Sequence, residues 1–147
     1  MQDRVAELLD KQEIQELANA YGAALDDRDW KRLAGCFVAD GSARYGTAAG
    51  FQEGFPAIET LCRGILERLD ASHHLISNLA VELHGDTARG RCLFQAQHVR
   101  NGAEGGSHYL MGGEYHDELR RTDAGWRIQQ REIRLVWHDG NPAVLTS

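Results

Sequence analysis

Apolar and polar positions in the first half of the chain recur at the spacing of α-helices. Between Val5 and Leu25 apolar side chains return every three or four residues and charged ones occupy the opposite face, which predicts one long helix. Asp29 is a candidate N-cap for a second, short helix over Trp30–Phe37. A third helix is predicted over Pro56–Leu69, because proline suits the first helical turn and the apolar positions that follow keep helical spacing.

The second half of the chain follows the two-residue alternation of β-strands. Segments rich in Gly, Asp and Asn, which are typical of hairpin turns, separate four predicted strands: Ser72–His84, Thr87–Arg100, Ser107–Thr122 and Trp126–His138. Earlier in the chain, Gly41–Tyr45 is a candidate short strand and the glycine-rich segment Gly46–Gly54 is predicted to be a covering loop. Helices followed by antiparallel strands predict an α+β domain, and long strands packed on few helices predict a curved sheet with an inner face.

Length and composition narrow the classes of protein further. A chain of 147 residues, 42% hydrophobic and 26% charged, predicts one globular domain over residues 1–147. The net charge of −6 and the scattered basic residues argue against a nucleic-acid partner. No apolar run approaches the roughly 18 residues of a membrane span, and no targeting segment is recognisable. Three widely spaced cysteines in apolar surroundings are typical of reduced core residues, so we expect a cytoplasmic protein.

The segment Tyr21–Asp26 closes the first predicted helix and holds a tyrosine and an aspartate five positions apart. Ala18, Gly22 and Asp26 share one narrow face of small side chains, which leaves space beside the carboxylate. Two interpretations remain open at this point. Asp26 either lines a pocket or ends the helix in solvent, as most carboxylates do.

Histidines stand out on two of the predicted strands. His74 and Asn78 are predicted on one face of the first strand together with Ile76, and His98 ends an apolar stripe on the next strand that includes Phe94. These side chains are candidates for an internal polar site. A lone histidine on an apolar strand face is, however, more often a hydrogen-bonded core or edge residue.

Arg131 interrupts the apolar pattern of the last predicted strand and needs a partner if it is buried. A surface pair with Glu114 or Glu132 is the alternative. The histidine spacing does not suit a metal site, and no glycine-rich phosphate motif follows a strand. We therefore expect neither a metal nor a cofactor.

The order of these elements coincides with four motifs. They are Ile14-Gln15-Glu16-Leu17 leading to Tyr21 and Leu25-Asp26, then Trp30, Leu33, Phe37 and Asp40, then His73-His74-Leu75-Ile76-Ser77-Asn78, and finally Trp126-Arg127-Ile128. Together they resemble the SnoaL-like branch of the nuclear transport factor 2 superfamily over Gln12 to His138. The resemblance implies a cystatin-like fold, in which a cone-shaped, antiparallel or mixed curved sheet is wrapped by three N-terminal helices.

Within that branch the chain is similar to scytalone dehydratase, bile acid 7α-dehydratase and hexachlorocyclohexane dehydrochlorinase. The resemblance implies a cofactor-independent lyase or isomerase that acts on a small hydrophobic ring substrate derived from a polyketide, steroid or aromatic compound by Asp/His general-base proton abstraction, with dehydration as the expected reaction. Dehydrohalogenation is a further possibility. The competing class is a non-catalytic binding protein or an accessory subunit resembling the small subunit of aromatic-ring dioxygenases, since one fold hosts several functions.

Elimination of water requires a base, a donor to the carbonyl oxygen and an acid for the leaving hydroxyl. We expect Asp26 to orient His74 as the base, Tyr21 to donate to the enolate and His98 to act as the acid, with Arg131 anchoring the network or a ligand oxygen. Four further side chains are expected to bind substrate: Tyr45, Phe55, Asn78 and Phe94.

A homo-oligomer, either a dimer or a trimer, is also expected. The reason is that Tyr109, Met111 and Tyr115 would form an exposed apolar patch if they lay on the outer face of the curved sheet.

Overall fold

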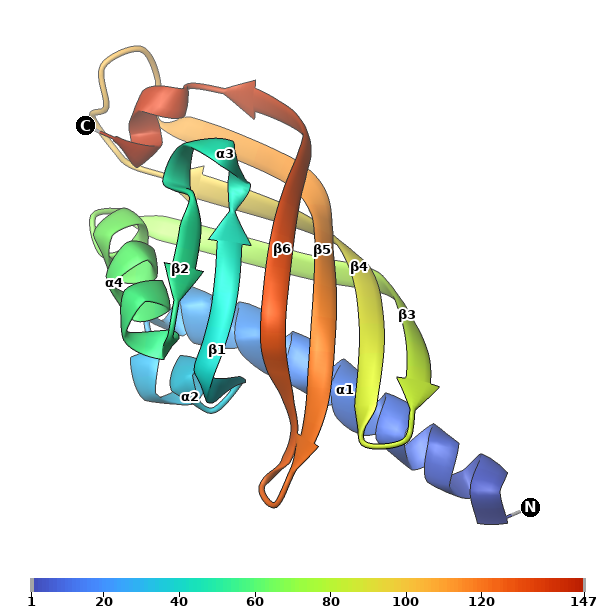
Figure 1. Ribbon diagram of the computed structural model, residues 1–147. Helices are drawn as coiled ribbons and strands as arrows, with labels where there is room; N and C mark the ends of the chain where they lie inside the picture. Colours follow the sequence, from blue (N-terminus) through green and yellow to red (C-terminus); the bar gives the residue numbers. More distant parts are fainter. Residues whose placement is uncertain (1, 147) are drawn as a thin grey trace.

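The structure, a computed structural model, describes residues 2–146 except the side chains of residues 2, 47 and 48. Helix α1 (Gln2–Asp27) runs behind the sheet and across its strands (Figure 1). Helices α2 (Trp30–Ala34) and α4 (Phe55–Leu66) lie near the C-terminal end of α1. A 3₁₀ turn, η1 (Pro142–Leu145), ends the described chain. None of the helices within residues 2–146 is both long and apolar enough to span a bilayer.

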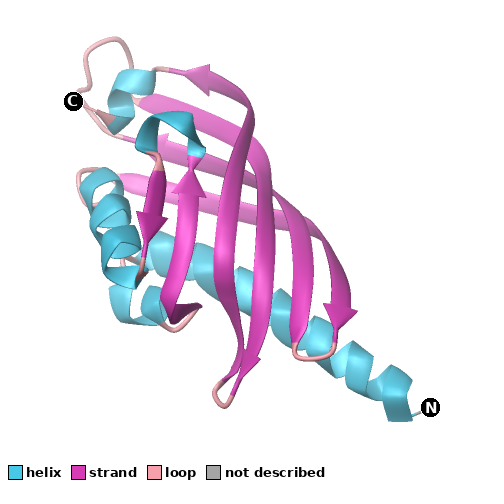
Figure 2. Ribbon diagram, viewed as in Figure 1, coloured by secondary structure: helices cyan, strands magenta, loops and turns pink. Residues whose placement is uncertain are grey.

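Six strands form one curved sheet (Figure 2), and their order across it is β2-β1-β6-β5-β4-β3, as labelled in Figure 1. Their bounds are β1 Phe37–Tyr45, β2 Phe51–Glu53, β3 Ala71–His84, β4 Thr87–Val99, β5 His108–Thr122 and β6 Gly125–Gly140. All neighbouring strands are antiparallel except β1 and β6, which are parallel, so the sheet is mixed. The α+β class and the curved, cystatin-like sheet predicted from the sequence are confirmed.

Strand β4 shows how the alternation of the sequence builds the core. Every second residue from Ala88 to His98 is buried on the concave side, and the residues between them are exposed or partly exposed. The apolar side chains among them belong to one hydrophobic core together with residues of α1 and α4. This alternation places Phe94 and His98 on the inner face, where a site can form.

The segment between Phe37 and Gly54 differs from the prediction. Phe37 begins β1 instead of ending a helix, and the predicted loop Gly46–Gly54 forms a short helix, α3 (Gly46–Ala49), and the edge strand β2. Gly46, Gly50 and Gly54 all have positive φ, which glycine adopts readily. The glycines therefore separate short elements, and the prediction of a loop was wrong.

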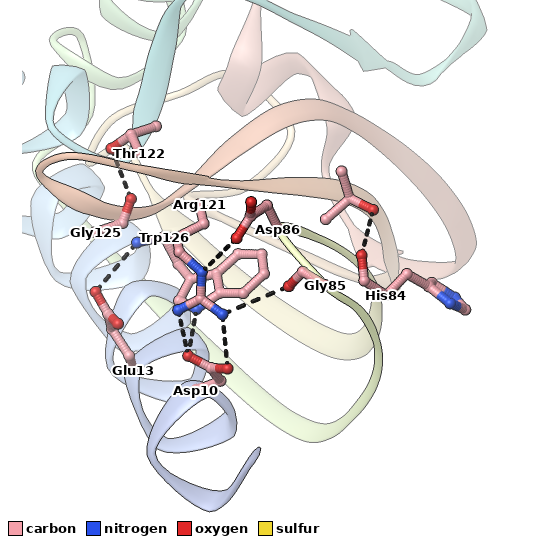
Figure 3. Close-up of polar contacts among 10 residues, drawn as sticks. Asp10, Glu13, His84, Gly85, Asp86, Arg121, Thr122, Gly125 and Trp126 are labelled. Carbon is pink, nitrogen blue, oxygen red and sulfur yellow. Dashed lines mark hydrogen bonds and ion pairs between the residues drawn. The ribbon is translucent and has the colours of Figure 1, made fainter. Parts of the chain in front are cut away.

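One network ties α1 to two hairpins of the sheet (Figure 3). Arg121 donates two hydrogen bonds to the Asp10 carboxylate at 2.7 and 2.9 Å and one to Asp86 at 3.0 Å, and its guanidinium lies 4.7 Å from the centre of the Trp126 ring. The Trp126 indole donates to Asp10 at 3.0 Å, and Glu13 accepts from the Trp126 backbone N–H at 3.1 Å. These contacts fix the position of α1 across the concave face.

A β-bulge in β3 changes the predicted face of Asn78. Asn78 has a φ of 57°, and the pairing of β3 with β4 shifts between Ser77 and Ala80. An inserted residue reverses the alternation, so His74 and Ile76 point inward before the bulge and Leu79 points inward after it. Asn78 itself is exposed, and the expectation that it shares the inner face with His74 was wrong.

The three residues from which a homo-oligomer was predicted do not lie on the outer face of the sheet. Tyr109 and Tyr115 are buried and Met111 packs against the core, so none of the three forms an outer patch. Different apolar side chains are exposed: Leu75, Leu93, Val136 and Trp137 on the sheet, and Val5, Leu8 and Leu9 on the end of α1 that extends beyond the strands (Figure 1). The reasoning from Tyr109, Met111 and Tyr115 was therefore wrong.

Candidate functional site

A cavity of about 530 Å³ lies between α1, α4 and the concave face of the sheet, next to α3 and η1. Most of its wall is apolar, and the polar side chains on it are those of Tyr21, Tyr45, Cys62, His74, His98, Tyr115 and Thr146. A second hollow, of about 870 Å³, opens on the α1 and β3 side and shares His74 and Phe94 with the first. His74 thus lies where the two hollows meet.

Asp26 and His74 form a close pair at the end of α1 and the beginning of β3. The Asp26 Oδ1 lies 2.7 Å from the His74 Nδ1, and the Oδ2 accepts the His74 backbone N–H at 2.8 Å. Ser72 donates from its hydroxyl to Oδ1 at 3.0 Å. Of the two interpretations open for Asp26, the geometry favours a carboxylate held inside a site over one that ends a helix in solvent.

The protonation of this pair follows from its contacts. Burial raises the pKa of Asp26, but hydrogen bonds from His74 and Ser72 more than offset it, so the pKa lies below its usual value and the carboxyl is ionised near neutral pH. An ionised carboxylate only accepts hydrogen bonds, so the His74 Nδ1 carries a proton. In the neutral imidazole the Nε2 then bears a lone pair and can act as a base.

His98 is buried beside this pair, with its ring centroid 6.0 Å from that of His74. The His98 Nδ1 donates to the Tyr109 carbonyl oxygen at 3.1 Å, which leaves the Nε2 without a proton in the neutral ring. Burial lowers the pKa of His98 to about 4. A neutral ring with a bare Nε2 accepts a hydrogen bond, which argues against the role of acid expected from the sequence.

The hydroxyls of Tyr21 and Tyr45 are hydrogen-bonded to each other on the cavity wall. The two phenolic oxygens are 2.8 Å apart, and the Cys62 thiol donates to the Tyr45 oxygen at 3.6 Å. Burial raises the pKa of both phenols, so they stay protonated and can donate. Because one hydroxyl donates to the other, the pair keeps one O–H proton for a ligand.

Arg131 does not line the cavity. It is 1% exposed, and its Nε and Nη2 each donate to the Asp117 carboxylate at 2.7 Å. The guanidinium carbon lies 4.2 Å from the ring centres of both Tyr21 and Tyr115. The partner is thus Asp117 and neither Glu114 nor Glu132, and Arg131 can reach a ligand only through the tyrosines.

The other expected substrate contacts separate into two groups. Phe94 lines the cavity and stacks on Tyr115, with ring centroids 4.5 Å apart and planes 10° apart. Gly113 makes room for this ring, because a Cβ there would lie 2.8 Å from it. Phe55 packs on Phe37 with a centroid distance of 5.9 Å and is not among the lining residues, and neither is exposed Asn78.

Three residues at the site were not predicted from the sequence: Arg28, Ser72 and Cys62. Ser72 precedes His74 by two positions on a strand, so the two-residue period could have placed both on one face. No spacing rule points to Arg28 or Cys62, because their contacts depend on how α1 and α4 meet the sheet. Within residues 2–146, no three His, Cys, Asp or Glu side chains gather as metal ligands.

Comparison with known proteins gives the family. A model of the SnoaL-like domain matches residues 6–132 of the chain. An uncharacterized protein of Mycobacterium tuberculosis is 32% identical over 127 residues, which are 86% of this chain and 86% of that protein.

Two solved structures share the fold at lower identity. A candidate scytalone dehydratase from Novosphingobium aromaticivorans superposes with a TM-score of 0.84 at 24% identity, covering 96% of this chain and 92% of that one. The hexachlorocyclohexane dehydrochlorinase LinA-type3 from Novosphingobium barchaimii gives a TM-score of 0.81 at 21% identity, covering 95% and 94%. At these identities the likeness lies in the fold.

Proposed function

The chain belongs to the SnoaL-like domain family, and from its cavity we propose that it is a cofactor-independent enzyme that removes a carbon-bound proton from a small ring ketone. The bond of 2.7 Å between Asp26 and His74, at the wall of an apolar cavity, carries this proposal. A paired histidine with a free Nε2 is a general base in the geometry that catalysis requires. The two solved structures described as dehydratase and dehydrochlorinase add support from analogy.

In the proposed reaction the His74 Nε2 takes the proton next to the carbonyl group, which gives an imidazolium and an enolate. Asp26 stabilises the imidazolium, and the free O–H of the Tyr21 and Tyr45 pair donates to the enolate oxygen. The bond from the β-carbon to its hydroxyl then breaks, and the imidazolium returns its proton to that hydroxyl. The products are an enone and water, and His74 is again neutral.

His98 has a different part in this scheme. Its bare Nε2 accepts a hydrogen bond from a substrate hydroxyl, which favours hydroxylated substrates over halogenated ones. Dehydration is therefore preferred to dehydrohalogenation. Isomerisation remains the second candidate. Moving a double bond requires a single base that takes a proton from one carbon and returns it to another, and His74 could serve as that base.

The cavity also defines the class of substrate. No Lys, Arg, Asp or Glu is among its described lining residues, and the charge of Arg131 is neutralised by Asp117. Burying a ligand carboxylate there without a partner would be unfavourable. We expect an uncharged one-ring or two-ring compound derived from a polyketide, steroid or aromatic precursor.

Exchange of carbon-bound protons tests the proposal without knowledge of the natural substrate. In D₂O, the protein is expected to accelerate deuterium uptake next to the carbonyl of 2-tetralone above the buffer rate. His74→Gln is expected to abolish the acceleration, and Asp26→Asn to lower it by roughly 10² to 10⁴-fold through loss of the orienting carboxylate. His84→Gln, on an exposed histidine, is the control.

Two results would contradict the proposal that the protein is an enzyme. One is a rate that does not exceed buffer for 2-tetralone and for a panel of β-hydroxy ring ketones. The other is a His74→Gln protein as active as the wild type. The alternative, a non-catalytic binding protein, predicts ligand binding in the cavity with neither exchange nor dehydration.

We further propose that the protein forms a homo-oligomer through the exposed apolar side chains of the sheet. Leu75 and Trp137 are 65% and 41% exposed, and with Leu93 and Val136 they line one hollow, so they form a contiguous apolar patch of the kind that marks an interface. Light scattering after size exclusion would show a multimer, and Trp137→Lys would shift it towards the monomer.

A further inference from the structure

A chain of hydrogen bonds leads from a surface turn to the Asp26 and His74 pair. The Arg28 Nη1 donates to the Ser72 Oγ at 2.8 Å, and the Ser72 hydroxyl donates to the Asp26 Oδ1 at 3.0 Å. The same Oδ1 lies 2.7 Å from the His74 Nδ1. Neither Arg28 nor Ser72 lines the cavity, so neither touches a ligand bound there.

The direction of the Ser72 hydroxyl follows from Arg28. A serine hydroxyl has one proton to donate and two lone pairs to accept with, and Arg28 can only donate. Because Arg28 occupies a lone pair of the Ser72 oxygen, the hydroxyl proton remains free to point at the Asp26 Oδ1. Ser72 is buried, so water does not compete readily for this proton.

Arg28 also holds the helix end that carries Asp26. Its Nη1 donates to the Leu25 carbonyl oxygen at 2.7 Å and to that of Asp26 at 3.3 Å, which satisfies acceptors in the last turn of α1. Arg28 does this from a backbone φ of 55°, in the left-handed region that favours glycine. An unfavourable backbone conformation beside a candidate active site suggests a role for the side chain.

We propose that Arg28 and Ser72 are positioning residues that fix the Asp26 carboxylate so that its Oδ1 faces the His74 Nδ1. The carboxylate then has three donors on two oxygens: the Ser72 hydroxyl, the His74 ring and the His74 backbone N–H. Three donors hold the carboxylate group of Asp26 in one orientation. The effect on catalysis rests on the proposed function, but the positioning itself does not.

The experiment uses Ser72→Ala, Arg28→Gly and two rescue variants. Glycine adopts a φ of 55° without strain, so Arg28→Gly removes the side chain while keeping the turn. Ser72→Thr and Arg28→Lys retain a hydroxyl and a cation, respectively. Ser77→Ala, at an exposed serine of the same strand, is the control, and thermal unfolding of each protein shows whether it is folded.

The first measurement is the proton NMR signal of the His74 Nδ1–H, which a carboxylate partner shifts far downfield. We expect Ser72→Ala and Arg28→Gly to shift it upfield or to lose it through faster exchange with water. In Ser72→Thr, Arg28→Lys and Ser77→Ala the signal is expected to stay near its wild-type position. If it is unchanged in both Ser72→Ala and Arg28→Gly, the inference is overturned whatever happens to activity.

The second measurement is the deuterium uptake of 2-tetralone. Each of Ser72→Ala and Arg28→Gly is expected to lower kcat about 10-fold with little change in KM, since neither residue touches the ligand, and the rescue variants should recover most of the loss. A lower rate with an unchanged Nδ1–H signal also overturns the inference. A wild-type protein without activity, but with the expected changes of the NMR signal, supports the positioning and refutes only the proposed function.

Discussion

The buried ion pair of Arg131 and Asp117 allows a quantitative test that needs no substrate. The Arg131 side chain is 1% exposed and that of Asp117 is 5% exposed, and two bonds of 2.7 Å join them. Asp117→Asn keeps the size and one acceptor oxygen but leaves the cation in the core without a counter-charge. Breaking a buried pair in this way costs about 3 to 5 kcal/mol of unfolding free energy.

A loss of this size is measurable. For a chain of this length each kcal/mol shifts Tm by about 2 to 4 °C, so Asp117→Asn should melt roughly 6 to 20 °C below the wild type. Guanidinium titration followed by circular dichroism gives the free energy, and calorimetry gives Tm.

Glu132→Gln is the matched control. The Arg134 to Glu132 pair has the same 2.7 Å distance on the same strand, but its side chains are 54% and 42% exposed. Solvent screening limits such a pair to about 0 to 1 kcal/mol. If Asp117→Asn loses no more stability than Glu132→Gln, the assignment of Arg131 and Asp117 as a core ion pair is wrong.

Three further predictions concern single positions. Burial lowers the pKa of His98 to about 4, so between about pH 6.5 and 4 the unfolded chain binds a proton at this histidine and the folded chain does not. Stability should therefore fall as pH drops over that range. In His98→Leu the slope of Tm against pH should be smaller. Gly113→Ala should destabilise by about 1 to 3 kcal/mol and change near-ultraviolet circular dichroism, because its Cβ would clash with the Arg134 carbonyl oxygen and with the Phe94 ring; unchanged spectra would contradict the packing. Asp10→Ala should lower the protection of α1 amides in hydrogen exchange, because it removes the α1 carboxylate that accepts from Arg121 and from the Trp126 indole, whereas equal protection would show that the network in Figure 3 does not hold the helix.

The sequence predicted those parts of the fold that depend on local periodicity. The long first helix and the four long strands follow from spacings of 3.6 and 2 residues. The pairing of Asp26 with His74 came from the resemblance, and the structure brings the two side chains together. Two features were not predictable in this way: the short elements between Gly46 and Gly54, which depend on the edge of the sheet, and the contacts of Arg28.

Two of the remaining errors, the face of Asn78 and the partner of Arg131, share one physical cause, which is the β-bulge. In β3 a residue with positive φ reverses the alternation and exposes Asn78. Between β5 and β6, an uninterrupted ladder from the turn at Thr122 would put His116 opposite Arg131. The register shift between Glu118 and Leu119 puts Asp117 there instead, so the arginine gains a buried partner that no sequence spacing shows.

A second shift between β5 and β6 acts directly on the cavity. The pairing moves between Gly112 and Gly113, which leaves Val136 exposed, turns Leu135 towards the cavity and lays Trp137 over Gly112. Each of these bulges changes which side chains reach the inner face while the strands remain continuous. Sequence periodicity therefore defines the sheet, whereas the positions of the bulges define which side chains form the cavity wall.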